Sequence, residues 1–338
     1  MKGPFFVLAT VTSAATFAQY TVNKVKTLDQ FHLTAAATSP VGSLVAFATE
    51  DNTVRVFDAA TCSTRFQLSG HPQRIGSVAF NKSGTALATG DDSARIYLWN
   101  PKTGQKIREF PRDKGHTKGI IGIAFSSDGS RMATVGNDDV IKVWKTSGGN
   151  PIGTILGKGA NLYGVAFTKS GGILTGTLAD GLRLYSGTTF QLVSTMAVAG
   201  GQGVNNITAN GDGSVALTAG RDGKLTMFSV PTRKKVGSFA GHNDWVINAA
   251  MSPNGKVGAS ASVDRTVSFW SLTNGKKLGV INDCSPVGSP IGFTGDGKYF
   301  IATSMSDGLT VFKVSPSQGG SSKPSLGSAK SKSPRRKK

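Results

Sequence analysis

Apolar and polar residues alternate in short runs along the whole chain, and no apolar stripe of helical spacing extends over ten or more residues. The run from Thr53 to Phe57 (TVRVF) is typical. Side chains that follow one another on an extended strand point to opposite faces of the sheet, so short alternating runs are typical of strands. With 44 glycines and only 8% aromatic residues, the sequence favours many short strands joined by tight turns. We predict an all-β fold.

A turn glycine recurs along the chain and divides it into seven similar units. The glycines are 42 residues apart, with one interval of 45, and they are Gly42, Gly84, Gly129, Gly171, Gly213, Gly255 and Gly297. Self-similarity at this period is the signature of a repeat architecture. Glycine suits these positions because a tight hairpin turn commonly needs a positive φ.

Two further series of positions run in step with the glycines. The first is aromatic in every unit and consists of Phe57, Trp99, Trp144, Tyr185, Phe228, Trp270 and Phe312. The second lies four residues before each glycine and consists of Thr38, Phe80, Phe125, Phe167, Ala209, Met251 and Phe293, mostly large residues that each follow a small one. A strand that alternates large and small side chains gives its sheet two different faces, which allows sheets to stack around an axis.

These features resemble the WD-repeat family, whose units of about 40–45 residues form the four-stranded blades of a β-propeller. The resemblance covers residues 20–314 and implies a seven-bladed β-propeller. It also implies a hydrogen-bonded chain of histidine, serine or threonine, aspartate and tryptophan that braces a blade. Carried over, the bracing residues are His71, Thr89 and Trp99 in the second repeat, His116, Thr134, Asp138 and Trp144 in the third, and His242, Ser260, Asp264 and Trp270 in the sixth.

Not every repeat follows the family pattern. In the second repeat Ser93 occupies the aspartate position and Asp92 is shifted by one. The first, fourth, fifth and seventh repeats lack the Gly-His pair and carry Phe or Tyr in place of Trp. We therefore expect packing to brace those four blades. The last repeat stops after three strands, and we expect residues 20–31 to supply its outer strand and close the ring, which also removes an exposed sheet edge.

The two ends of the chain differ in composition from the repeats. Residues 1–19 combine Lys2, an apolar run from Phe5 to Ala18 and a small-residue end, which fits a secretory signal peptide and is too short to cross a bilayer. The alternative is an ordinary first strand. Residues 315–338 are rich in Ser, Gly, Pro and Lys, and this composition indicates a disordered basic tail. The predicted domains are thus a leader at 1–19, a propeller at 20–314 and a tail at 315–338.

The two termini indicate different compartments. The leader favours an extracytoplasmic location, periplasmic or secreted, whereas Arg335 to Lys338 would act as a nuclear-localisation patch if the leader were a strand. We expect export, with a nuclear or cytoplasmic location as the alternative. The net charge of +19 favours non-specific contact of the tail with nucleic acid or with an anionic membrane.

No set of residues indicates catalysis. Three of the four histidines occupy the bracing position, and no Cys/His cluster has the spacing of a zinc site. No nucleophile, base and orienting group stand out together, so we expect neither an enzyme nor a cofactor, with a propeller enzyme or small-ligand binder as the third alternative.

The loops that lead into each first strand and the turns before each aromatic strand should share one face, the usual partner-binding face of the resembled family. The candidate partner-binding residues there are His32, Arg74, Lys118, Asn161, Tyr163, Asn206, Arg221, Asp244, Trp245 and Arg265. Trp245 alone among the four tryptophans lies outside the aromatic series. We expect it to form a hot spot with Asp244, Arg74 and Lys118 around it, because tryptophan and arginine dominate interface energetics.

The opposite face collects cations in its turns and their flanks: Lys82, Lys102, Lys106, Lys169, Arg233, Lys234, Lys235, Lys256, Lys276, Lys277 and Lys298. A plain solubilising surface is one explanation. The leading functional hypothesis is a protein- or peptide-binding scaffold, monomeric outside its complexes. The second is a nuclear or nucleoid-associated scaffold that contacts nucleic acid through this face and the tail.

Overall fold

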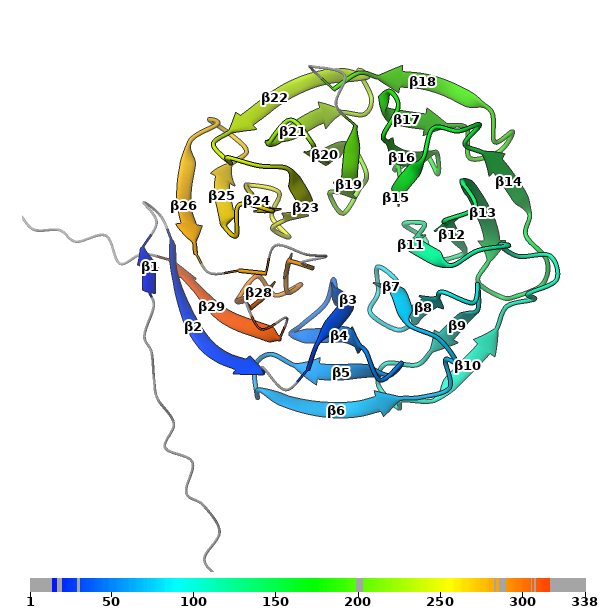
Figure 1. Ribbon diagram of the computed structural model, residues 1–338, viewed down its shortest axis with the longest axis horizontal. Helices are drawn as coiled ribbons and strands as arrows, with labels where there is room; N and C mark the ends of the chain where they lie inside the picture. The colour runs from blue at the N-terminus through cyan, green and yellow to red at the C-terminus, as the bar shows by residue number, and fades with distance from the viewer. Residues whose placement is uncertain are drawn as a thin grey trace, which may run out of the picture.

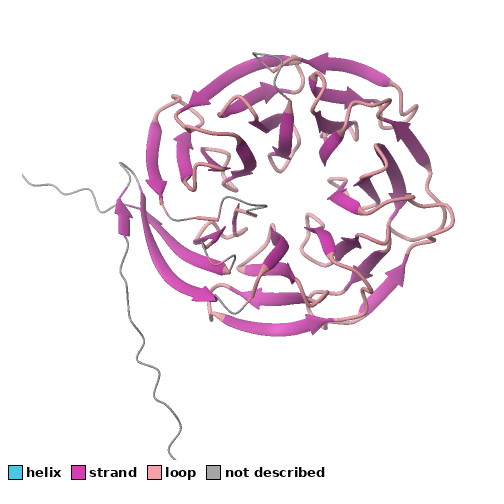
Figure 2. Ribbon diagram, in the orientation of Figure 1, coloured by secondary structure: helices cyan, strands magenta, loops and turns pink. Residues whose placement is uncertain are grey.

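Seven small antiparallel sheets stand around a central axis like the blades of a propeller (Figure 1). The computed structural model describes residues 14–16, 20–28, 31–198, 203–282, 284–285, 290–304, 306 and 308–316. Within these ranges all regular structure is strand, and no helix occurs (Figure 2). The predicted all-β, seven-bladed propeller is confirmed.

Each of blades 1 to 6 takes its strands in chain order from the axis to the rim. Blade 1 contains β3 (Leu33–Thr38), β4 (Leu44–Thr49), β5 (Val54–Asp58) and β6 (Ser63–Leu68); blade 2 contains β7 (Ile75–Phe80), β8 (Leu87–Asp91), β9 (Ile96–Trp99) and β10 (Lys106–Glu109); blade 3 contains β11 (Ile120–Phe125), β12 (Arg131–Gly136), β13 (Val140–Lys145) and β14 (Gly153–Leu156). Blade 4 contains β15 (Leu162–Phe167), β16 (Ile173–Thr177), β17 (Gly181–Tyr185) and β18 (Leu192–Met196); blade 5 contains β19 (Val204–Ala209), β20 (Val215–Gly220), β21 (Lys224–Ser229) and β22 (Lys234–Ala240); blade 6 contains β23 (Val246–Met251), β24 (Val257–Ser262), β25 (Val267–Ser271) and β26 (Lys277–Ile281).

Blade 7 joins the two ends of the propeller sequence. It contains β27 (Gly292–Phe293), β28 (Tyr299–Thr303) and β29 (Leu309–Pro316), and its outer strand is β2 (Tyr20–Leu28). β2 pairs antiparallel with β29 from Tyr20 opposite Pro316 to Leu28 opposite Leu309. The predicted ring closure by an N-terminal strand is confirmed.

A fifth strand, β1 (Ala14–Thr16), extends the sheet of blade 7. It pairs with β2 through Ala14 opposite Asn23 and Thr16 opposite Thr21. These three residues fall within the segment predicted as a leader, so removal of residues 1–19 would leave blade 7 with four strands like the other blades. The remaining residues of that segment, and those of the predicted tail beyond Pro316, lie outside the described residues.

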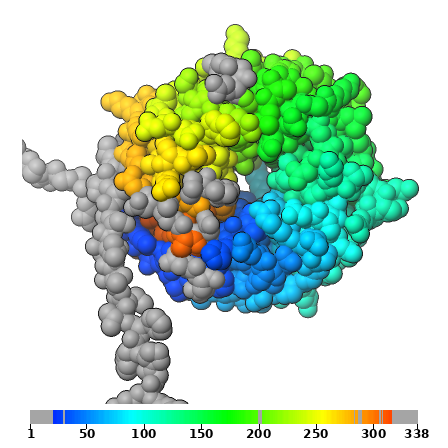
Figure 3. Space-filling view, viewed as in Figure 1, coloured from blue at the N-terminus to red at the C-terminus, as the bar shows by residue number. Residues whose placement is uncertain are grey.

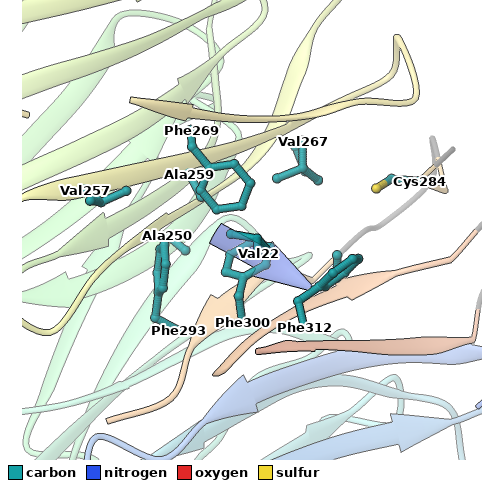
Figure 4. Packing of buried hydrophobic residues seen from close by; sticks show 12 residues of the cluster. Val22, Ala250, Val257, Ala259, Val267, Phe269, Cys284, Phe293, Phe300 and Phe312 are labelled. Carbon is teal, nitrogen blue, oxygen red and sulfur yellow. The ribbon is translucent and has the colours of Figure 1, made fainter. Parts of the chain in front are cut away.

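The core lies between neighbouring blades, because each sheet buries both of its faces. Between blades 6 and 7, Phe269 of β25 packs against Phe300 of β28 with ring centroids 4.9 Å apart, and Phe293 lies 4.8 Å from Phe300 (Figure 4). Val22 from β2 enters the same cluster. The N-terminal strand therefore closes the ring through side-chain packing as well as through backbone hydrogen bonds.

The antiparallel order gives the disc two distinct faces. The side that carries the turns between the first and second strands, and between the third and fourth strands, of each blade is called the lower face. The upper face carries the turns from second to third strands and the loops between blades. β29 runs from the upper to the lower face, and β2 begins beside its end at Tyr20. The propeller chain therefore begins and ends on the lower face.

The inner strands surround an axial cavity of about 620 Å³, which hollows the centre of the disc (Figure 3). Small residues let these strands approach one another closely. A Cβ added to Gly76 of β7 would come 2.5 Å from the carbonyl oxygen of Ile120 in β11. Such a clash with backbone cannot be relieved by a side-chain rotation, so glycine is required there.

Candidate functional site

A buried hydrogen-bond chain links the upper face of blade 3 to its core. His116 Nδ1 lies 2.9 Å from Asp138 Oδ1, and its Nε2 lies 2.8 Å from Thr134 Oγ1. Trp144 Nε1 donates to the same hydroxyl oxygen at 2.9 Å. The chain thus ties the loop that carries the histidine to the second and third strands of its blade.

Blade 6 repeats this arrangement with a serine. His242 Nδ1 lies 2.9 Å from Asp264 Oδ2, its Nε2 lies 2.8 Å from Ser260 Oγ, and Trp270 Nε1 donates to that oxygen at 2.8 Å. Burial lowers the pKa of His242, and this outweighs the attraction of Asp264. The neutral ring therefore donates from Nδ1 to the carboxylate and accepts the serine hydroxyl at Nε2.

In blade 2 the carboxylate comes from a residue that the sequence analysis did not identify. Asp91, the last residue of β8, lies 2.8 Å from His71 Nδ1 through its Oδ2. Ser93, which occupies the family's aspartate position, donates to Asp91 Oδ1 at 2.7 Å. Thr89 Oγ1 lies 2.6 Å from His71 Nε2 and accepts from Trp99 Nε1 at 2.9 Å. The signal was present in the sequence as an aspartate two residues before the expected position.

Hydrogen bonds keep the bracing carboxylates ionised. Burial raises the pKa of Asp264, but donation from Thr266, from the backbone of Asn243 and from His242 lowers it overall. The pKa of Asp138 is likewise lowered, because donation from His116 and from the Thr117 backbone outweighs burial. Each carboxylate therefore accepts from its histidine in the negatively charged form, which makes the bond stronger than one between neutral groups.

Blades 1 and 4 use arginine, which corrects the expectation that packing alone braces the blades without a Gly-His pair. In blade 1, Arg55 donates to Asp51 Oδ2 at 2.8 Å and to Thr49 Oγ1 at 2.5 Å. In blade 4, Arg183 donates to Asp180 Oδ2 at 2.7 Å and to the Gly157 carbonyl at 3.1 Å. Both arginines lie two residues before the aromatic position of their repeat, a regularity that the sequence offered.

The ten predicted partner-binding residues all belong to loops and turns of the upper face or to the first residues of inner strands. Exposed among them are His32, Arg74, Lys118, Asn161, Asp244, Trp245 and Arg265, whereas Tyr163, Asn206 and Arg221 are half-buried. Asn206 also lines the axial cavity. The ten residues belong to blades 1 to 6 or to the loops that lead into them, so they are spread over the upper face rather than gathered in one compact patch.

The structure brings together one group from this set, at the boundary between blades 5 and 6. The guanidinium of Arg221 lies 4.6 Å from the ring centroid of Trp245. Arg221 Nε donates to Asn205 Oδ1 at 3.0 Å, and Asn205 Nδ2 donates to the carbonyl of Val246 at 2.9 Å. We call Asn205, Arg221, Asp244 and Trp245 the Trp245 cluster. Trp245 remains 45% exposed although its neighbour is fixed, so its ring is available for contact.

Arg74 and Lys118 do not surround Trp245, which corrects the expected hot spot. Blade 6 adjoins blades 5 and 7, whereas Arg74 precedes blade 2 and Lys118 precedes blade 3 (Figure 1). Arg74 instead lies 3.9 Å from Asp92. Position within a repeat predicts which face a residue lies on. Only the order of the blades around the ring decides which residues are neighbours.

Within the described residues, no three His, Cys, Asp or Glu side chains are grouped as a metal ion would require. No helix long and apolar enough to cross a membrane was found in that part of the chain. The His–Asp pairs that resemble acid–base machinery are buried in the blades: the side chains of His71 and Asp91 are only 1% and 0% exposed. The side chains of His116 and His242 are 0% exposed, so the three histidines lie inside their blades and link the loop to the strands.

Comparison with known proteins identifies the repeats that carry the histidine chains. The family description "WD domain, G-beta repeat" matches residues 62–100, 104–145 and 233–271. Each match begins near the outer strand of one blade and ends with the third strand of the next, which contains the bracing tryptophan.

Curated relatives share this repeat character. The WD repeat-containing protein srw1 of Schizosaccharomyces pombe is 25% identical over 70% of this chain and 42% of its own length. The B-type cell cycle switch protein ccs52A of Medicago truncatula is 26% identical over 68% of this chain and 49% of its own. The guanine nucleotide-binding protein subunit beta of S. pombe is 32% identical over 21% of this chain and 25% of its own. The chain thus spans less than half the length of these relatives.

Proposed function

Because the chain belongs to the WD-repeat family of β-propellers, we propose that it is a non-catalytic scaffold that binds a protein or peptide on its upper face. The relatives are named as a repeat protein, a cell cycle switch protein and a G-protein subunit rather than as enzymes. The buried location of the His–Asp pairs supports the same conclusion.

The Trp245 cluster carries this proposal. Tryptophan has a large apolar ring, yet Trp245 has one face on Arg221 and leaves 45% of its surface exposed. Arg221 is itself fixed by its hydrogen bond to Asn205, so stacking on it holds the Trp245 ring in place before a partner binds. Pre-organised aromatic anchors reduce the entropy lost on binding. We therefore place the partner-binding hot spot at this cluster.

The test is Trp245→Ala, compared with the wild-type chain in thermal unfolding and in quantitative capture of partners from a native extract. We expect nearly unchanged unfolding, since the side chain is not packed in a blade, and at least about a 30-fold loss of affinity, the equivalent of about 2 kcal/mol. Val236→Ala is the matched control, because Val236 is 51% exposed on the outer strand β22. A strongly lowered melting temperature with unaltered capture would refute the assignment.

The scaffold is further proposed to act outside the cytoplasm. Support comes from the leader-like sequence of residues 1–19, with its apolar run and small-residue end. Mass spectrometry of the native protein tests this proposal directly. A mature N-terminus near Gln19 supports export, and a chain that retains Lys2 and the apolar run argues against it.

A further inference from the structure

Charge is distributed unequally between the two faces of the disc. The described turns of the lower face carry seven basic residues and three acidic ones: Lys82, Lys102, Lys169, Arg233, Lys256, Lys276 and Lys298 against Asp128, Asp212 and Asp296. The described turns and loops of the upper face carry eight basic and ten acidic residues. Of the two faces, only the lower one therefore carries an excess of positive charge in its turns, and further basic residues lie on the strands between the faces.

The lower-face cations are free to meet an external anion. All seven side chains belong to exposed residues, and in the described part of the chain none of them takes part in an ion pair. The acids of this face are occupied within their own turns. Asp128 accepts from Ser126 Oγ at 2.6 Å, and Asp296 accepts from Thr294 Oγ1 at 2.6 Å. Asp212 accepts from Ser214 Oγ at 2.6 Å, and of the seven cations Lys169 lies near enough to help lower the pKa of this carboxyl.

The lower face also exposes aliphatic surface. Val41, in the turn between β3 and β4, is 56% exposed, and Ile152, in the turn between β13 and β14, is 41% exposed. An apolar cavity of about 160 Å³ lies beside the turns that precede β24 and β28, with Val257, Phe269 and Leu278 in its lining. No aromatic residue is among the large hydrophobic side chains exposed on this face in the described chain.

This composition distinguishes between two polyanions. A surface that binds single-stranded nucleic acid commonly stacks bases on aromatic rings, and arginine is favoured for phosphate recognition. Six of the seven cations are lysines and the exposed apolar groups are aliphatic. Lysines beside aliphatic side chains match the interface of a bilayer, where anionic headgroups lie above acyl chains.

The last described strand of the propeller ends at the same face. β29 ends at Pro316 on the lower face, and the residues that follow include seven cations and no acid: Lys323, Lys330, Lys332, Arg335, Arg336, Lys337 and Lys338. We propose that the lower face of the propeller lies against an anionic lipid bilayer, with its turn lysines on the headgroups and the upper face turned away. This orientation would leave the Trp245 cluster open to a soluble partner.

The experiment measures binding of the full chain to phosphatidylcholine vesicles with and without 30% phosphatidylserine by co-sedimentation. We expect binding only to the anionic vesicles. The face variant is Lys82→Glu/Lys256→Glu/Lys298→Glu, and the control is Arg112→Glu/Lys114→Glu/Lys158→Glu, which makes the same change in net charge on the upper face. Each lysine at a bilayer surface contributes roughly a fivefold factor, so the face variant should bind at least about 100-fold more weakly, and the control within a few-fold of wild type.

Three results would overturn the proposal. Equal binding of both variants to the anionic vesicles would mean that the tail or the net charge alone, and not the lower face, attracts the protein to the bilayer. Equal binding to vesicles without phosphatidylserine would exclude recognition of anionic lipid. Tighter binding to a short duplex DNA than to the anionic vesicles at the same salt concentration would favour a nucleic-acid scaffold. Thermal unfolding of both variants must match the wild type, which shows that each comparison is made between folded proteins.

Discussion

Blades 3 and 1 both connect the loop before the first strand to the turn before the third strand, but they use different side chains to do so. In blade 3 the loop before the first strand supplies His116, and the turn supplies its acceptor Asp138. In blade 1 the third strand supplies Arg55, which bonds Asp51 in the turn and lies 4.2 Å from the ring centroid of Phe31 in the loop. A blade therefore needs a polar connection between loop and turn, and more than one side chain can provide it.

The difference between the two blades is one of charge and depth. The side chain of His116 is 0% exposed and its chain reaches a core tryptophan, whereas the side chain of Arg55 is 12% exposed and bonds groups near the surface. Removal of a partner from the buried network leaves a polar atom without a hydrogen bond in the core. This lowers stability more than removal of a partner near the surface, where water can replace the lost hydrogen bond. Three predictions test this contrast, beginning with the largest effect.

Asp91→Ala should destabilise the protein by about 3 kcal/mol, because it leaves His71 Nδ1 buried without an acceptor. Ser93→Ala is the matched change, and we expect it to cost about 1 kcal/mol or less, since Asp91 keeps its bond to His71. Urea unfolding at pH 7 measures both. If Ser93→Ala lowered the free energy of unfolding more than Asp91→Ala, Ser93, at the family's aspartate position, would be the bracing residue instead of Asp91.

Arg55→Gln should have an intermediate effect of about 1–2 kcal/mol, because it removes charged hydrogen bonds to Asp51 and Thr49 at a partly accessible site. Arg65→Gln serves as control. Arg65 bonds Asp58 but is 53% exposed, and exposed ion pairs contribute about 0–1 kcal/mol. Equal losses in chemical unfolding would mean that Arg55 does not brace blade 1.

The smallest expected effect is a pH dependence that arises from His242 in blade 6. Burial holds the pKa of His242 below its ordinary value of 6.5, so the unfolded chain binds this proton more readily than the folded one. Stability from this group is complete above pH 6.5 and is lost as the pH falls towards the folded pKa. His242→Gln should flatten the curve of unfolding free energy between pH 7 and pH 5. An unchanged slope would show that His242 does not titrate in this window.

The repeat positions predicted the architecture because blade geometry constrains them strongly. The turn glycines adopt positive φ, for example +70° at Gly42 and +66° at Gly84, and the aromatic positions of blades 1 and 5 are only 1% exposed at Phe57 and Phe228. Backbone strain and core packing leave few alternatives at such sites. The order of blades, the closing strand and the core positions follow from these constraints.

The upper face was predictable only in part, because surface contacts depend on neighbours that no repeat position specifies. Trp245 stood out as the tryptophan outside the aromatic series, but its stacking on Arg221 depends on the adjacent blade. Arg74 and Lys118 lie on the upper face, as predicted, but they precede blades 2 and 3 and are therefore not neighbours of Trp245. Asp91 was missed since a shift of two residues along a turn still directs a carboxylate to the same histidine.

Closure of the ring by its two ends has a consequence for the time course of folding. Thr27 of β2 and Thr310 of β29 pair although they are 283 residues apart in the sequence, whereas the strands within each of blades 1 to 6 are joined by short turns. Bringing such distant segments together costs about 3.5 kcal/mol more in chain entropy than closing a five-residue turn. At about 5–20 residues per second on the ribosome, β2 waits roughly 14–57 s for its partner. During that interval the segment of β2 lacks the strand with which it pairs in the finished ring. Concentration during synthesis, rather than the stability of the finished ring, therefore sets the risk that β2 pairs with another chain.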